Sequence, residues 1–287
     1  MAGARLIDTL ERIHEDWGGD GLARLRITAE TAPRAEARAA GEEAEILVST
    51  GLVELIAAWF TAEGPAPDEL AEQAMVQSLY LLYLHEVGHV LHGHLRFPLP
   101  GASGPGLRMV DHPMALVAAR AAFEFEADRW AVRQFVWEAS GGDDLDAESL
   151  LLAVVEAAMA ASVMTEVMDR HVHARDGAAR LWSALGRFDE MQIHPPLLLR
   201  RFLMLDSAVR LVDGEAPRRA VEKAWGSGTA LAHRSDGPMP RLLGSAFLEL
   251  AQEYRDPHAM ANELDARLRL IRELGLVPTT EGDSDAA

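Results

Sequence analysis

The side chains best suited to chemistry form one short run, in which residues 85 to 89 read His-Glu-Val-Gly-His. On a helix, positions i and i+4 lie only about 40° apart around the axis. His85 and His89 would therefore face the same side and could share a metal ion. Glu86 follows His85 directly and could reach a water molecule on that ion. The run predicts a metal site with a general base beside it.

This HExxH arrangement is typical of zinc peptidases, in which a third protein ligand completes the site. The chain has no cysteine, so that ligand must be His, Asp or Glu. Residues 124 to 128 read Glu-Phe-Glu-Ala-Asp. Glu124 and Asp128 share one helix face, whereas Glu126 lies about 200° from Glu124 and should point away. We expect Glu124 to be the third ligand, Asp128 to accept the Nδ1 proton of a liganding histidine, and Glu126 to contribute little.

Simpler interpretations of these segments stay open. The two histidines could be core residues with satisfied hydrogen bonds, and the acidic run could be an exposed helix face. Gly88, in the middle of a predicted helix, costs about 1 kcal/mol relative to alanine, which predicts close packing against another element. His92 and His94 are interpreted as solvated side chains or as supports for the end of the helix.

Four segments, in this order, resemble the M48 family of zinc metallopeptidases, the group that contains the CAAX-prenyl endopeptidases. They are the strand-to-helix passage at residues 46–52, the HExxH run extended to His94, an ExxAD element at residues 124–128, and His194-Pro195-Pro196 followed by Arg200. The likeness covers residues 45–205, and its specificity comes from the ordered set more than from any one motif.

The resemblance implies a helical zincin-like domain that binds Zn2+ through His85, His89 and Glu124. It implies a metalloendopeptidase that hydrolyses peptide bonds of a protein or peptide substrate, with a zinc-activated water and Glu86 as general base. It also implies that His194 donates a hydrogen bond to the developing oxyanion. The alternative for His194 is a helix-start residue held extended by Pro195.

Other functions stay open. Well-known membrane members of the family carry spanning helices, which this sequence is not expected to form. A similar pattern also occurs in antirepressor-type regulatory peptidases, and a catalytically silent zinc-binding module with the same fold would carry the same motifs. A structural zinc site is disfavoured because such sites usually have four protein ligands and favour cysteine. If residues 46–50 form an edge strand, their backbone could bind a substrate strand; if the strand is interior, it is only core.

Composition limits the partners. The net charge is −18, from 27 basic and 45 acidic residues, which argues against a nucleic-acid partner. The N-terminus lacks the apolar core of a signal peptide. The most apolar stretch, residues 150–164, is interrupted by Glu156 and is expected to fall short of a spanning helix. We therefore expect a cytoplasmic protein without membrane insertion, and no pattern indicates an oligomeric state.

Abundant alanine and leucine favour helices over sheet, so the expected fold class is mainly α (α+β), with a small β element near the N-terminus. Expected helices cover residues 1–17, 51–62, 68–93, 114–139, 145–170 and 197–212, and expected strands cover 22–28 and 44–50. Prolines and glycines predict a loop at 97–113. Residues 1–278 are expected to form a single domain, followed by a disordered acidic tail at 279–287.

Overall fold

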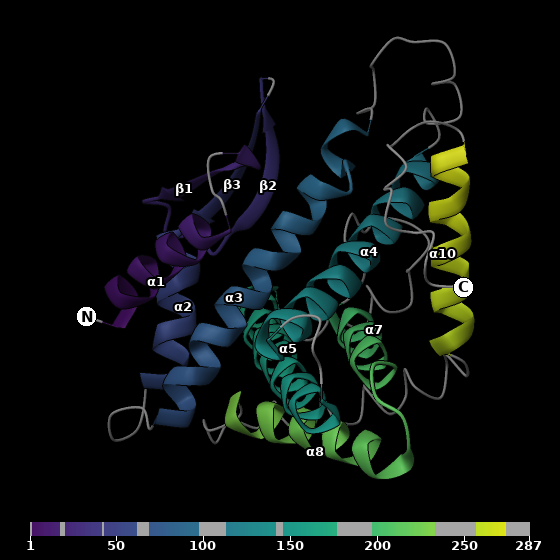
Figure 1. The fold of residues 1–287 in the computed structure, drawn as a ribbon. Coiled ribbons are helices and arrows are strands. Elements are labelled where there is room, and N and C mark those ends of the chain that lie inside the picture. Colours follow the sequence, from purple (N-terminus) through teal and green to yellow (C-terminus); the bar gives the residue numbers. More distant parts are fainter. Residues whose placement is uncertain are drawn as a thin grey trace.

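A computed structural model describes residues 2–17, 21–41, 43–61, 69–97, 113–141, 146–176, 197–232 and 257–273. These residues form a mainly helical fold with one small sheet, as the composition predicted (Figure 1). The helices are α1 (Ala2–Asp16), α2 (Thr50–Thr61), α3 (Glu69–Leu91), the short 3-10 helix η2 (His94–Arg96), α4 (Pro113–Ala139), α5 (Ala147–Asp176), α7 (Leu197–Val209), α8 (Glu215–Ala232) and α10 (Pro257–Glu273). The strands are β1 (Arg24–Thr28), β2 (Ala35–Ala40) and β3 (Glu43–Ser49).

The sheet has the strand order β1-β3-β2, with β3 parallel to β1 and antiparallel to β2. The predicted strand at residues 44–50 is therefore interior, and the edge strand is β2. The sequence analysis missed β2 because its residues read Ala-Glu-Ala-Arg-Ala-Ala, a composition that favours helix. Pairing with β3 forms this strand, and Arg38 donates from Nε to Glu45 directly opposite, at 2.7 Å.

Most expected helices agree with the structure. Helix α1 buries Leu6 and Leu10 as predicted, and β3 leads directly into α2. Helix α5 is longer than expected; its start is capped by Asp146, whose Oδ1 accepts hydrogen bonds from the backbone N–H groups of Glu148 and Ser149. Asp68, where the expected helix at 68–93 begins, residues 98–112 of the expected loop at 97–113 and the tail at 279–287 lie outside the described residues.

The apolar stretch in α5 does not fall short in length. Residues Ala147–Thr165 are long and apolar enough to cross a membrane by length and composition, and half of that window is buried inside the structure. Helix α5 packs against α3, α4, α7 and α8, so part of its apolar surface is buried in the core. The core helix of a soluble protein can have the same length and composition.

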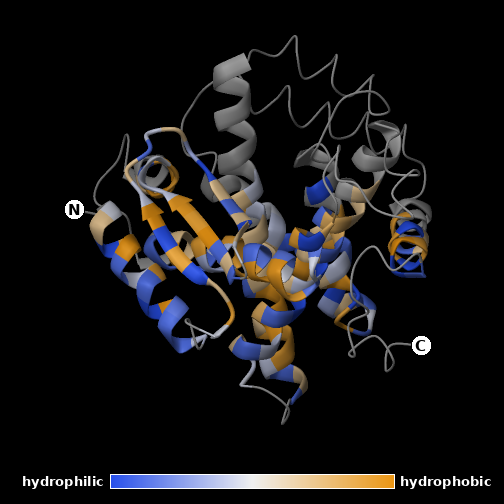
Figure 2. Cartoon of the chain, turned by 90° about the horizontal axis from the view of Figure 1, so that it is seen from above, coloured by the Kyte–Doolittle hydropathy of each residue, from blue (hydrophilic) through white to orange (hydrophobic). Residues whose placement is uncertain are grey.

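Helix α3 lies at the centre, between the sheet and helices α4 and α5 (Figure 1). Hydrophobic residues are prominent on the strands and the central helices (Figure 2). From Ser78 to Gly88, every α3 residue except the half-buried Tyr80 is buried. A helix covered on all sides has no solvated face, so each polar side chain on this stretch needs a partner inside the protein.

Helices α3 and α4 approach each other closely at Gly88. A Cβ atom at this position would be 3.2 Å from the Cα of Ala127 and 3.3 Å from the Cε3 of Trp130. The prediction of close packing at Gly88 is thus confirmed. Because the two backbones meet here, the side chains that flank Gly88 on α3 lie beside those that flank Ala127 on α4.

Gly88→Ala should lower the free energy of unfolding although alanine is the better helix former. The gain of about 1 kcal/mol in helix propensity is opposed by overpacking against a backbone atom, which typically costs about 1–3 kcal/mol. Gly226→Ala in α8 is the matched control, since a Cβ there meets nothing within 4 Å. Urea unfolding should show a higher free energy of unfolding than the parent for Gly226→Ala and no such increase for Gly88→Ala. Equal stabilisation of both variants would contradict the close contact.

Candidate metal centre

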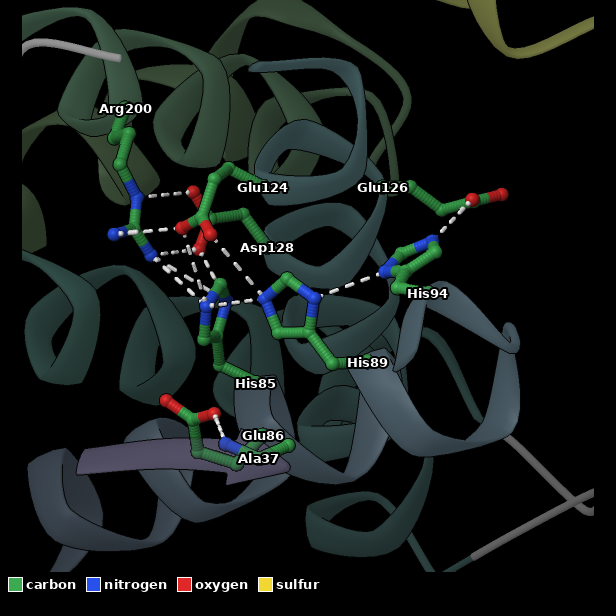
Figure 3. Close-up of polar contacts among 9 residues, drawn as sticks. All are labelled: Ala37, His85, Glu86, His89, His94, Glu124, Glu126, Asp128 and Arg200. Atoms are coloured by element: carbon green, nitrogen blue, oxygen red, sulfur yellow. Dashed lines mark hydrogen bonds and ion pairs between the residues drawn. The ribbon is translucent and has the colours of Figure 1, made fainter. Parts of the chain in front are cut away.

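Helices α3 and α4 bring three potential metal ligands together (Figure 3). His85 and His89 come from successive turns of α3, and Glu124 comes from the facing side of α4. Their ligand atoms all lie within 4.8 Å of one another, and the group could hold a metal ion. Glu124 is thus the carboxylate that joins the two histidines, in the arrangement that the helical spacing indicated.

The distances within this group fit a metal centre. The two Nε2 atoms of His85 and His89 are 3.1 Å apart, and each lies 3.5 Å from an oxygen of Glu124. Three ligands of a tetrahedral zinc ion, at bond lengths of about 2.0–2.1 Å, are separated by about 3.3 Å from one another. The two histidines, and each histidine with its own oxygen of Glu124, are separated by distances close to this value, so the group could hold a metal ion.

His85 is oriented from its other ring nitrogen. Its Nδ1 lies 2.8 Å from Oδ1 of Asp128, the contact expected for a carboxylate one turn beyond Glu124. Asp128 is in turn held by Arg200 of α7, whose Nε and Nη2 donate to its two oxygens at 2.8 and 2.7 Å. Nη1 of Arg200 also lies 3.2 Å from Oε2 of Glu124. Bidentate pairs of this kind fix geometry as well as charge.

Electrostatics at His85 favour a positive charge. Burial and the Arg200 guanidinium disfavour protonation of its ring, but the carboxylates of Asp128 and Glu124 outweigh them and raise the pKa of His85 to about 10. Burial would raise the pKa of Asp128, but the charges of Arg200 and His85 and their hydrogen bonds to the carboxylate lower it. A metal ion that binds here must displace this proton, because a histidine ligand binds in its neutral form.

His89 is also contacted at Nδ1, in this case by another histidine. Gly93 has a left-handed backbone with φ of 69°, which turns the chain after α3 so that η2 begins at His94. The buried ring of His94 places Nδ1 2.9 Å from Nδ1 of His89 and Nε2 2.9 Å from Oε2 of Glu126. His94 is therefore not solvated, whereas its contact with His89 in the last turn of α3 agrees with the alternative that it supports the end of the helix.

Glu126 points away from the three ligands, as its angle on the helix predicted, but it is buried and paired. Its second oxygen, Oε1, accepts a hydrogen bond from Arg272 of α10. Burial alone would raise the pKa of Glu126, yet the hydrogen bond from His94 and the charges of His92 and Arg272 lower it to about 2. The acidic run at 124–128 is thus no exposed face, since Glu124, Glu126 and Asp128 are all buried.

Glu86 faces the sheet. Its Oε2 accepts a hydrogen bond from the backbone N–H of Ala37 in β2, at 2.6 Å (Figure 3). The carboxylate is buried beside His85 and is not one of the three grouped ligands. One oxygen of Glu86 is therefore anchored to the edge strand of the sheet.

Comparison of the chain with models of protein families, with curated proteins and with solved structures finds no match. The resemblance to the M48 family consequently rests on the ordered sequence motifs alone. His194, the predicted oxyanion donor, lies outside the described residues.

Two functional contacts had no assigned role in the sequence analysis. Arg200 was noted only as part of the His-Pro motif, and Arg272 was not singled out. Both are arginines that neutralise buried carboxylates of α4 from helices far along the chain. A buried acidic residue needs a paired cation, so the acidic residues of α4 indicated that basic partners were required. The partner's position could not be read from the sequence.

The purified protein should bind one divalent metal ion per chain. His89→Ala and Glu124→Ala should each remove most of it, because two remaining ligands do not hold zinc tightly. Glu72→Ala on an exposed position of α3 is the control and should keep a full equivalent. Metal analysis by mass spectrometry after dialysis measures this. Full retention by His89→Ala would contradict the ligand assignment.

Proposed function

We propose that the protein is a zinc-dependent metalloendopeptidase. The observation that carries the proposal is the group of His85, His89 and Glu124, whose ligand atoms lie within 4.8 Å of one another, with Glu86 next in sequence to the first ligand. Among the described residues the group has three members, which leaves a coordination position open, as in catalytic rather than structural zinc sites. Zinc held there would supply Lewis-acid chemistry, by polarising a carbonyl oxygen and lowering the pKa of water.

Glu86 is the proposed general base. The backbone N–H of Ala37 occupies Oε2 of Glu86, so Oε1 is the atom that would accept a proton from the attacking water. The same carboxyl would then pass this proton to the leaving amine nitrogen. The hydrogen bond from Ala37 holds the carboxylate in place during both transfers, because its donor belongs to a sheet rather than to a loop.

The edge strand β2 is the proposed docking site for an extended substrate. The backbone N–H of Ser49 donates to the carbonyl of Arg34, so Arg34 directs its backbone groups towards β3. Alternate residues of an antiparallel strand do the same, so residues 36, 38 and 40 also direct their backbone groups towards β3. The backbone N–H and C=O groups of Ala35, Ala37 and Ala39 therefore point away from the sheet. The hydrogen bond from the Ala37 N–H to Glu86 lies on this outward side, and it supports the proposal that a substrate strand here would lie near Glu86. An added substrate strand would be recognised mainly through its backbone.

Glu86→Gln should keep the fold and the bound zinc but abolish hydrolysis, because an amide cannot accept the proton from water. Quantitative proteomics of newly formed termini should be compared between cells expressing the parent chain and the variant. Cleavages present only with the parent would identify substrates. Equal cleavage by both proteins would exclude Glu86 as the base. A zinc-loaded parent that cuts nothing in cells or in a peptide library would instead favour the silent binding module.

Ala39→Pro should impair peptide cleavage without metal loss. Proline removes the outward N–H of Ala39 but no ladder bond to β3, and an edge strand tolerates it there. Loss of one backbone hydrogen bond of about 1 kcal/mol predicts at least about a fivefold lower kcat/KM on a validated substrate. The control is Ala39→Val, which keeps the N–H and should retain activity. Unchanged kcat/KM in the proline variant would contradict substrate binding along β2.

A further inference from the structure

The two histidine ligands are supported differently. His85 is oriented by a carboxylate, Asp128, in direct contact with its Nδ1. At the same position of His89 stands a second imidazole, His94, and only behind it a carboxylate, Glu126. The contacts thus form a chain that leads from His89 through His94 and Glu126 to Arg272. The central link between His94 and Glu126 is buried, and the two outer links are part-buried.

The chemistry of these groups sets the direction of every hydrogen bond in this chain. The carboxylate of Glu126, paired with Arg272, can only accept, so Nε2 of His94 carries the hydrogen that it donates. In a neutral imidazole the other nitrogen then has a lone pair, so Nδ1 of His94 accepts from Nδ1–H of His89. His89 is left with an unprotonated Nε2, the atom that faces His85 and Glu124.

We propose that His94, Glu126 and Arg272 form a positioning relay that fixes the tautomer and ring orientation of His89 for metal binding. The relay makes α10, the last helix of the described residues, part of the proposed metal centre. This inference rests on the proposed metal site, and it does not depend on peptidase activity.

Packing around the relay restricts its members to this arrangement. The ring of His94 stacks on Phe123 of α4, with centroids 4.4 Å apart and planes at 20°. Helix α10 is held against α4 by its buried residues Leu264, Leu268 and Ile271, which recur along one face. Arg129 of α4 also pairs with Asp265 of α10 at 2.8 Å. Arg272 therefore reaches Glu126 from a docked helix rather than from a free terminus.

The test measures zinc affinity by chelator competition, together with the tautomer of His89. Long-range 1H–15N correlation spectra distinguish an imidazole protonated at Nδ1 from one protonated at Nε2, and His89→Gln identifies the cross-peaks of His89. The parent should show the Nδ1–H tautomer of His89. His94→Phe, which keeps a ring stacked on Phe123, should shift it towards Nε2–H and weaken zinc binding about 10- to 100-fold.

Two further variants keep the test informative if His94→Phe fails to fold. Glu126→Gln is isosteric, and its amide can also donate to Nε2 of His94, so it should populate the wrong tautomer and weaken zinc binding. Arg272→Met should weaken zinc binding, and Arg272→Lys should restore part of the affinity. Arg269→Met, at an exposed position of the same helix, is the control and should bind zinc as the parent does. Circular dichroism verifies the fold of each variant.

The outcomes separate the relay from the metal site. The relay alone would be overturned if the parent binds zinc and the folded variants His94→Phe, Glu126→Gln and Arg272→Met bind it with an affinity within twofold of the parent. The tautomer of His89 would also be unchanged in that case. Absence of zinc binding by the parent would overturn the proposed metal site. An altered His89 tautomer in these variants together with weaker zinc binding would establish the relay, whether or not any peptide is cleaved.

Discussion

The backbones of α3 and α4 meet at Gly88 and Ala127, and this contact governs the geometry of the site. Because the two helices approach this closely, each histidine Nε2 lies 3.5 Å from an oxygen of Glu124, His85 from Oε2 and His89 from Oε1. A helix pair separated by larger side chains would hold Glu124 beyond reach of the histidines, since usual interaxial distances depend on the residues at the contact. The small residues at the crossing are therefore a condition for the metal centre and not a detail of packing.

Close approach of these helices buries three carboxylates of α4, and each has a defined partner. Glu124 faces the two histidines, Asp128 is paired with Arg200, and Glu126 is paired with Arg272. Buried carboxylates without such partners would cost several kcal/mol each. Helices α7 and α10 supply the two arginines, so their docking stabilises the acidic stretch that α4 presents to α3. The two arginines thus link the metal centre to parts of the chain that lie far from its motif.

The sequence predicted those features that depend on spacing along one helix. His85 and His89, one turn apart, and the opposed faces of Glu124 and Glu126 follow from 3.6 residues per turn. Helical angles do not reveal whether the far face is solvated, so the burial of Glu126 was missed. Strand β2 was missed because pairing with β3, and not its alanine-rich composition, determines its conformation. Arg272, 146 residues from Glu126, carried no local signal at all.

The burial of α3 around residues 81–88 explains why one short run of sequence has contacts in three directions. His85 and His89 face α4, Gly88 lets that helix approach, and Glu86, about 100° from His85 around the axis, reaches the sheet instead. On a half-exposed helix Glu86 could remain solvated and adopt many rotamers. Here burial requires a donor, and the outward N–H of Ala37 supplies it. The same requirement places the proposed base between the ligand histidines and the edge strand, where an extended peptide bound to β2 would pass both.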